Sequence, residues 1–148
     1  MSKFFLLGIG HPLRSDDAAG SFIAQHFKDK NWVVVDGKSA PENYSSIIKK
    51  NRPTLMVIVD SVEMDLTPGS IRIIPLKRIV SFQLSTHYLS LSYLIEYISP
   101  YCQKIIFIGI QPLSLEIGEK LSKPVQEACY LVMDLLRSKQ FNNIPVLK

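Results

Sequence analysis

Three apolar runs constrain the fold of this chain more than any other feature. They span Lys3–Gly10, Thr54–Asp60 and Lys104–Pro112. None of them alternates apolar and polar residues, as a strand with one face in water would. A strand that is apolar throughout is covered on both faces, as in a parallel sheet between two layers of helices. Segments with helical spacing of apolar residues separate the runs, so the sequence predicts parallel strand–helix–strand units.

The rest of the chain completes this pattern. Trp32–Asp36 predicts another strand, and the turn Pro68–Gly69 precedes a short, partly alternating segment that predicts an antiparallel edge strand. Helices are predicted over residues 18–27, 41–50, 85–98 and 123–136. We therefore predict one α/β domain over residues 1–148, a three-layer sandwich around a mostly parallel twisted sheet of about five strands with an antiparallel edge strand.

Composition excludes several classes of protein. Hydrophobic residues make up 47% of the 148 residues and charged residues 20%, which is typical of a soluble globular protein. No apolar run reaches the ~18 residues of a membrane span, so we expect a cytoplasmic protein without membrane insertion. The net charge is +4, but the basic residues are scattered, which argues against nucleic-acid binding. Cys102 and Cys129 lack metal-site spacing, and Cys129 is expected in the core. We expect a monomer.

The segment "GIGHPLRSDDAAG", residues 8–20, joins the first strand to the first helix. It begins like a glycine-rich dinucleotide turn, but Leu13 occupies the position of the third glycine. Asp16 and Asp17 stand at the helix N-terminus, where they would repel a phosphate group. We therefore expect no nucleotide cofactor.

The acidic residues leave two interpretations open. Asp16 and Asp17 suit helix capping, although one acid would be enough for that purpose. Asp60 at a strand end suits a turn, and His87 at a helix start suits a structural role. The alternative is that Asp17, Asp60 and His87 converge at the carboxyl edge of the sheet, where two carboxylates and one imidazole would suit a divalent transition metal. His11, in the glycine turn, also lies near that edge.

Three motifs in order, "GIGHPLRSDDAAG", the strand end "VIVD" and the helix start "STH", resemble the hydrogenase maturation protease family. The segments "NWVVVDGKSAPEN", "IRIIP" and "IFIGIQP" resemble its formate-hydrogenlyase-type (hydrogenase 3) branch. The resemblance covers Phe5 to about Leu136. It implies an endopeptidase that removes the C-terminal extension from the large-subunit precursor of a nickel–iron hydrogenase.

The resemblance also implies roles for particular residues. Asp17, Asp60 and His87 would contact the metal, which would be the nickel already inserted in the substrate rather than a resident cofactor. Asp17 or Asp60 would act as the general base. His11 and Ala18 depart from the family pattern, which usually has Asn and Gly there, and we expect Ala18 to start the helix one residue early.

Two other functions remain open at this point. One is a metal-dependent hydrolase with its own zinc or manganese at the same three residues. The other is a non-enzymatic, nickel-binding maturation chaperone. For an enzyme, Gln111 and the loop Asp36–Asn43 are candidates for holding the substrate tail, because both would lie at the carboxyl edge.

Overall fold

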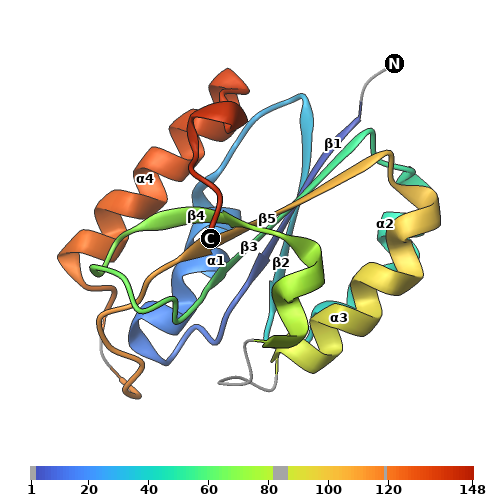
Figure 1. Ribbon diagram of the computed structural model, residues 1–148. Helices are drawn as coiled ribbons and strands as arrows, with labels where there is room; N and C mark the ends of the chain where they lie inside the picture. Colours follow the sequence, from blue (N-terminus) through green and yellow to red (C-terminus); the bar gives the residue numbers. More distant parts are fainter. Residues whose placement is uncertain (1–2, 82–86, 119) are drawn as a thin grey trace.

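The strands form one sheet with a single antiparallel member. The computed structural model describes residues 3–81, 87–118 and 120–148, and the side chains of residues 80–90 lie outside this description. The strand order is β2-β1-β3-β5-β4 (Figure 1). The strands are β1 (Phe4–Ile9), β2 (Trp32–Lys38), β3 (Leu55–Ser61), β4 (Ile71–Ile74) and β5 (Lys104–Ile110). Only β4 runs antiparallel, against β5, so the predicted fold class and edge strand are confirmed.

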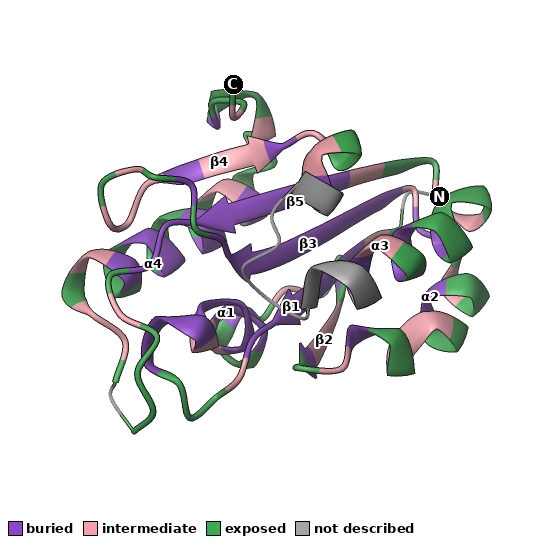
Figure 2. Cartoon of the chain, turned by 60° about the horizontal axis from the view of Figure 1, so that its bottom comes forward, coloured by how far each residue is buried: buried purple, intermediate pink, exposed green. Residues whose placement is uncertain are grey.

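Helices cover both faces of the sheet. Figure 1 shows α1 and α4 on one face and α2 and α3 on the other. The α-helices are α1 (Ala19–His26), α2 (Ser45–Asn51), α3 (His87–Ile98) and α4 (Lys123–Ser138). Short 3-10 helices are η1 (Ser15–Ala18), η2 (Pro41–Tyr44), η3 (Leu76–Ser81), η4 (Ser99–Tyr101) and η5 (Phe141–Asn143). Each face has its own apolar core, and every residue of β3 between them is buried (Figure 2).

Two predicted helices differ in detail from those observed. The segment predicted as a helix over 41–50 is divided into η2 and α2, with Pro41 in the first turn of η2. The helix predicted to start at Ala18 starts at Ala19, and η1 precedes it. Ala18 has a φ of −81°, so the alanine avoids the strained positive φ that glycine tolerates. The N-cap predicted at Ser85 or Thr86 lies outside the described residues.

Glycines bring α1 unusually close to the sheet. A Cβ added to Gly8 in β1 would lie 2.0 Å from the carbonyl oxygen of Gly20 in α1. A Cβ added to Gly20 would lie 2.2 Å from the oxygen of Ile9. The first glycine of the turn therefore serves helix–strand packing, and this close approach fixes the start of α1 against β1 and β3.

The end of the chain covers the outer edge of β4. The Ile73 amide donates to the Pro145 oxygen at 2.9 Å, and the Leu147 amide donates to the Ile73 oxygen at 2.8 Å. These bonds occupy backbone groups that an edge strand would otherwise expose to another sheet. Within the described parts of the chain, no helix is long and apolar enough to span a membrane.

Candidate active site

The chain reverses its direction of sheet growth between β1 and β3. From β1 it passes to β2 on one side, and the later strands add on the other side. In such sheets the ligand crevice lies at the carboxyl ends of the two strands at this switch point. Asp17 follows β1 and Asp60 lies near the end of β3, and the two strands are neighbours as assumed, so both acids lie at this edge of the sheet.

Ser61 joins these two acids. Its backbone amide donates to Oδ1 of Asp60 at 2.8 Å, and its hydroxyl donates to Oδ1 of Asp17 at a long 3.4 Å. Asp17 is 8% exposed and Asp60 is 1% exposed. Sequence reasoning missed Ser61, although its position directly after a strand-end Asp was a usable signal. We call Asp17, Asp60 and Ser61 the acid pair site.

Asp60 is not a turn residue. It lies within β3 and opposes Gly109 of β5 in the parallel register. The interpretation of Asp60 as a turn former is therefore wrong. A carboxylate inside a buried strand is costly unless it is compensated or used, because burial removes its hydration.

Asp16 has a different environment from its neighbour. It is fully buried and accepts hydrogen bonds from the amides of Leu113 at 2.8 Å and Ser114 at 3.1 Å. It also accepts from the Ser122 amide at 2.7 Å and the Ser122 hydroxyl at 2.8 Å. We call this set the Asp16 clamp. It holds both ends of the loop 112–122 against η1, so Asp16 is explained by structure rather than by helix capping.

The glycine turn orients Asp17. The His11 amide donates to Oδ2 of Asp17 at 3.1 Å. A Cβ on Gly10 would lie 1.9 Å from the Asp17 carbonyl oxygen, so only glycine permits this close approach. The Leu13 amide donates to Nδ1 of His11 at 3.2 Å. The turn thus uses Nδ1 of His11 internally, which removes that nitrogen as a ligand for a metal.

For His87, the third predicted metal contact, the structure describes the position of the backbone only. His87 is the first residue of α3, as predicted, but its side chain lies outside the described residues. Among the residues whose side chains are described, no three His, Cys, Asp or Glu side chains converge as a metal site. Asp17 and Asp60 supply hard oxygen ligands of the kind that divalent cations accept, which is compatible with their predicted role as metal contacts.

Gln111 is used by the protein itself. Its Oε1 accepts from the Met64 amide at 2.7 Å and the Leu66 amide at 3.2 Å, and its Nε2 donates to Glu63 at 2.6 Å. The side chain is 3% exposed. Gln111 therefore supports the loop after β3 and is not retained as a holder of a substrate tail. In the other candidate loop, Lys38 and Ser39 are exposed.

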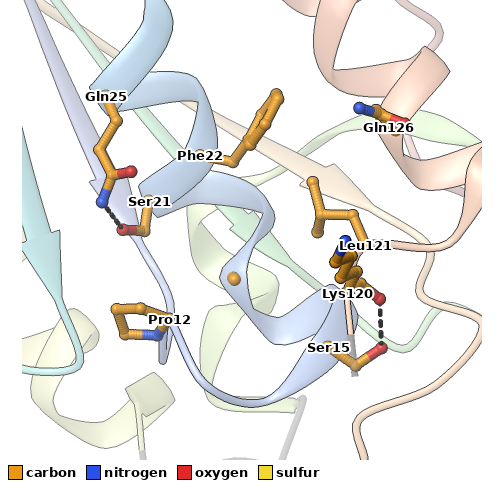
Figure 3. A pocket seen from close by; sticks show the side chains of 9 residues that line it. Pro12, Ser15, Ser21, Phe22, Gln25, Lys120, Leu121 and Gln126 are labelled. Carbon is orange, nitrogen blue, oxygen red and sulfur yellow. Dashed lines mark hydrogen bonds between the residues drawn. The ribbon is translucent and has the colours of Figure 1, made fainter. Parts of the chain in front are cut away.

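A groove of about 340 Å³ lies beside η1, between α1 and the segment that leads into α4 (Figure 3). The Ser15 hydroxyl donates to the Lys120 oxygen at 3.2 Å and joins its two walls. Its lining combines apolar side chains with hydroxyl, amide and ammonium groups. It consists of Pro12, Ser15, Ala18, Ser21, Phe22, Gln25, Lys120, Leu121 and Gln126.

The two cysteines have no features of a nucleophile. Burial raises the pKa of Cys102 to about 11. Burial, with a smaller contribution from the negative charge of Asp16, raises the pKa of Cys129 to about 12. Cys129 is fully buried in the α1–α4 core, which confirms its predicted place. Nearly all of each thiol is therefore protonated at neutral pH and unreactive.

Comparison with known proteins gives a consistent result. A family model described as hydrogenase maturation protease matches residues 19–139. Hydrogenase 3 maturation protease of Escherichia coli K12 is 38% identical over 93% of this chain and 90% of its own length. The solution structure of endopeptidase HycI from Escherichia coli superposes with a TM-score of 0.90 at 35% identity, covering 100% of this chain and 97% of that one.

A more distant structure agrees. The nickel–iron hydrogenase maturation protease HycI of Thermococcus kodakarensis superposes with a TM-score of 0.77 at 27% identity, covering 93% of this chain and 91% of that one. The family model begins after β1 and Asp17, whereas the superposition on the Escherichia coli endopeptidase covers the whole chain. The chain belongs to the hydrogenase maturation protease family.

Proposed function

We propose that this chain is an aspartate-dependent endopeptidase that removes the C-terminal extension of a nickel–iron hydrogenase large-subunit precursor after nickel insertion. The observation that carries the proposal is the acid pair site. Two buried carboxylates at a topological switch point are held next to each other by one serine. Family membership supports the peptidase activity, and the site supplies groups suited to it.

Asp17 and Asp60 have two roles in this proposal. Together with His87, they contact the nickel that the precursor already contains. One of the two also acts as general base for the water that attacks the scissile carbonyl. The water oxygen bonds to the carbonyl carbon and its proton passes to the carboxylate. The carbon–nitrogen bond then breaks, and the carboxylate returns that proton to the nitrogen, which leaves as the amine of the released extension while the new carboxyl group stays on the large subunit.

The same two carboxylates would let the protease distinguish a precursor that contains nickel from one that does not. Buried acids in close proximity repel each other and favour a cation between them. A precursor that contains nickel gains this interaction, and a precursor without nickel does not. Selection is then a difference in binding free energy between two forms of one substrate.

The test compares nickel-loaded and nickel-free precursor, incubated with the purified protein and analysed by mass spectrometry at the C-terminus. We expect trimming of the loaded form only, and its loss in Asp17→Asn. Asp134→Asn, an exposed change on α4, is the matched control and should trim normally.

Other outcomes separate the alternatives. Trimming of both forms would contradict nickel sensing. Stoichiometric zinc or manganese in the purified active protein would instead indicate a hydrolase with a resident metal. Nickel-dependent binding of the precursor without any trimming would indicate a chaperone.

A further inference from the structure

Two loops at the carboxyl edge carry large apolar side chains that face solvent. Ile117 is 78% exposed and Leu13 is 66% exposed, the highest values for large apolar residues in the described part of the chain. Leu113 is 61% exposed and Leu115 is 39% exposed. We call these four residues the apolar rim.

The apolar rim is one contiguous feature. The Gly118 amide donates to the Leu13 oxygen at 2.8 Å, and the Asp16 amide donates to the Ser114 oxygen at 3.0 Å. These bonds place the turn that carries Leu13 directly against the loop that carries the other three residues. In Figure 2 the two loops are exposed segments that lie side by side at the same end of the molecule.

Hydrogen bonds hold these loops in place, so the apolar side chains of the rim are exposed in an ordered conformation. The Asp16 clamp fixes the loop 112–122 through Leu113, Ser114 and Ser122. Isolated exposed apolar residues are ordinary on protein surfaces. Several of them together on a fixed loop beside a candidate active site are typical of an interaction surface.

We infer that the apolar rim, with the adjoining groove, is the docking surface for the body of the large-subunit precursor; this inference rests on the proposed function. Continuity with the acid pair site identifies the occupant. Leu13 lies between His11 and Asp17 in the turn that orients the Asp17 carboxylate. A protein whose peptide bond reaches Asp17 thus comes close to the turn that exposes Leu13.

The groove continues the same surface. Pro12, next to Leu13, and Leu121, in the segment that follows the rim loop, both line it. Figure 3 shows Pro12 and Leu121 on opposite sides of the space beside η1. An apolar rim next to a recess can accept one anchoring side chain of a partner while the rim excludes water around it.

The test uses glutamine substitutions, which remove apolar surface at similar size. We expect Leu13→Gln combined with Ile117→Gln to raise KM for nickel-loaded precursor by about tenfold while kcat and the melting temperature stay unchanged. The matched control is Leu131→Gln, because Leu131 is 51% exposed on α4 and outside the rim. The control should keep the wild-type KM.

Two results would overturn the inference. One is a KM for the double variant equal to that of Leu131→Gln. The other is a wild-type dimer, measured by light scattering, that Ile117→Gln converts to a monomer, since the rim would then join two copies of the chain. Failure of the proposed function looks different, because the wild-type protein would then trim no precursor at all, or would trim nickel-loaded and nickel-free precursor alike.

Discussion

Asp16 and Asp17 are adjacent in sequence and both buried, yet their carboxylates contact different regions of the molecule. Asp16 faces the loop 112–122 and accepts four hydrogen bonds from it. Asp17 faces the end of β3, where the nearby groups are the Ser61 hydroxyl and the second acid, Asp60. Asp17 also accepts from the His11 amide within its own turn, so its bonds hold it at the end of β3, whereas those of Asp16 hold a distant loop.

The difference shows how one turn supplies both support and chemistry. A buried carboxylate with several amide donors stabilises the fold. A buried carboxylate beside another acid is unfavourable for folding and becomes useful only when a cation or a proton arrives. Removing the charge of Asp16 should therefore mainly lower stability, and removing the charge of Asp17 should mainly lower activity.

The largest expected effect is on catalysis. Asp17→Asn and Asp60→Asn should each lower kcat/KM for nickel-loaded precursor by at least about a hundredfold, because each removes a metal contact or the general base. Both variants should remain folded, so that the loss of activity reports on the chemistry rather than on unfolding. Activity assays and thermal melts check both points. A wild-type rate in either variant would exclude that residue from the chemistry.

The next effect is on stability. Asp16→Asn should lower the free energy of unfolding by about 2–4 kcal/mol, because the NH2 group of Asn cannot accept from the donors that now surround one of the two carboxylate oxygens, and the bonds to the other oxygen lose their charge. Urea unfolding measures this loss, with Asp17→Asn as the matched neighbour. Equal stability of the two variants would contradict the distinction drawn between the acids.

A smaller effect is expected at Ser61, which forms hydrogen bonds with both acids. Ser61→Ala removes the long hydroxyl bond to Asp17 and keeps the backbone amide bond to Asp60. We expect kcat to fall by about tenfold or less, through poorer orientation of Asp17. Ser61→Thr keeps a hydroxyl and should recover part of the loss. If Ser61→Ala and Ser61→Thr were equally impaired, the hydroxyl would not be the relevant group.

The smallest effect is a reporter of the Asp16 clamp. Because burial raises the pKa of Cys129 to about 12, native protein at pH 8 should resist alkylation at that thiol. Asp16→Asn should speed alkylation of Cys129 by increasing the unfolded fraction, and Asp17→Asn should leave it unchanged. Mass spectrometry resolves the modified residue. Faster labelling in Asp17→Asn than in Asp16→Asn would argue against the clamp.

The fold was largely predictable because its signals are local. The uninterrupted apolar runs of β1, β3 and β5 require cover on both faces, and the turn before β4 marks an edge. The boundaries that differed, at η1 and η2, are single turns in which 3-10 and α geometry compete closely.

The roles within the site were less predictable because they depend on distant partners. The residues that bond Asp16 lie 97 to 106 positions further along the chain, so nothing near it distinguished it from Asp17. Gln111 was assigned to a substrate tail for the same reason, since its partners in residues 63–66 are joined to it only by the folded sheet. The location of Asp17 and Asp60 at one edge of the sheet followed from strand ends, which are visible in sequence, whereas Ser61, which bonds to both, was missed.

The Asp16 clamp also has a consequence for biosynthesis. The turn that carries Asp17 is among the first segments to leave the ribosome, whereas Ser122 emerges when most of the chain has been made. Long-range contacts of this kind form late, because a large loop of chain must close first. A nascent chain that ends before residue 122 therefore lacks the two Ser122 bonds of the Asp16 clamp and keeps at most those from Leu113 and Ser114. The clamp is therefore completed only when the chain has been synthesised through Ser122, so the loop after β5 gains its second attachment to η1 late in synthesis.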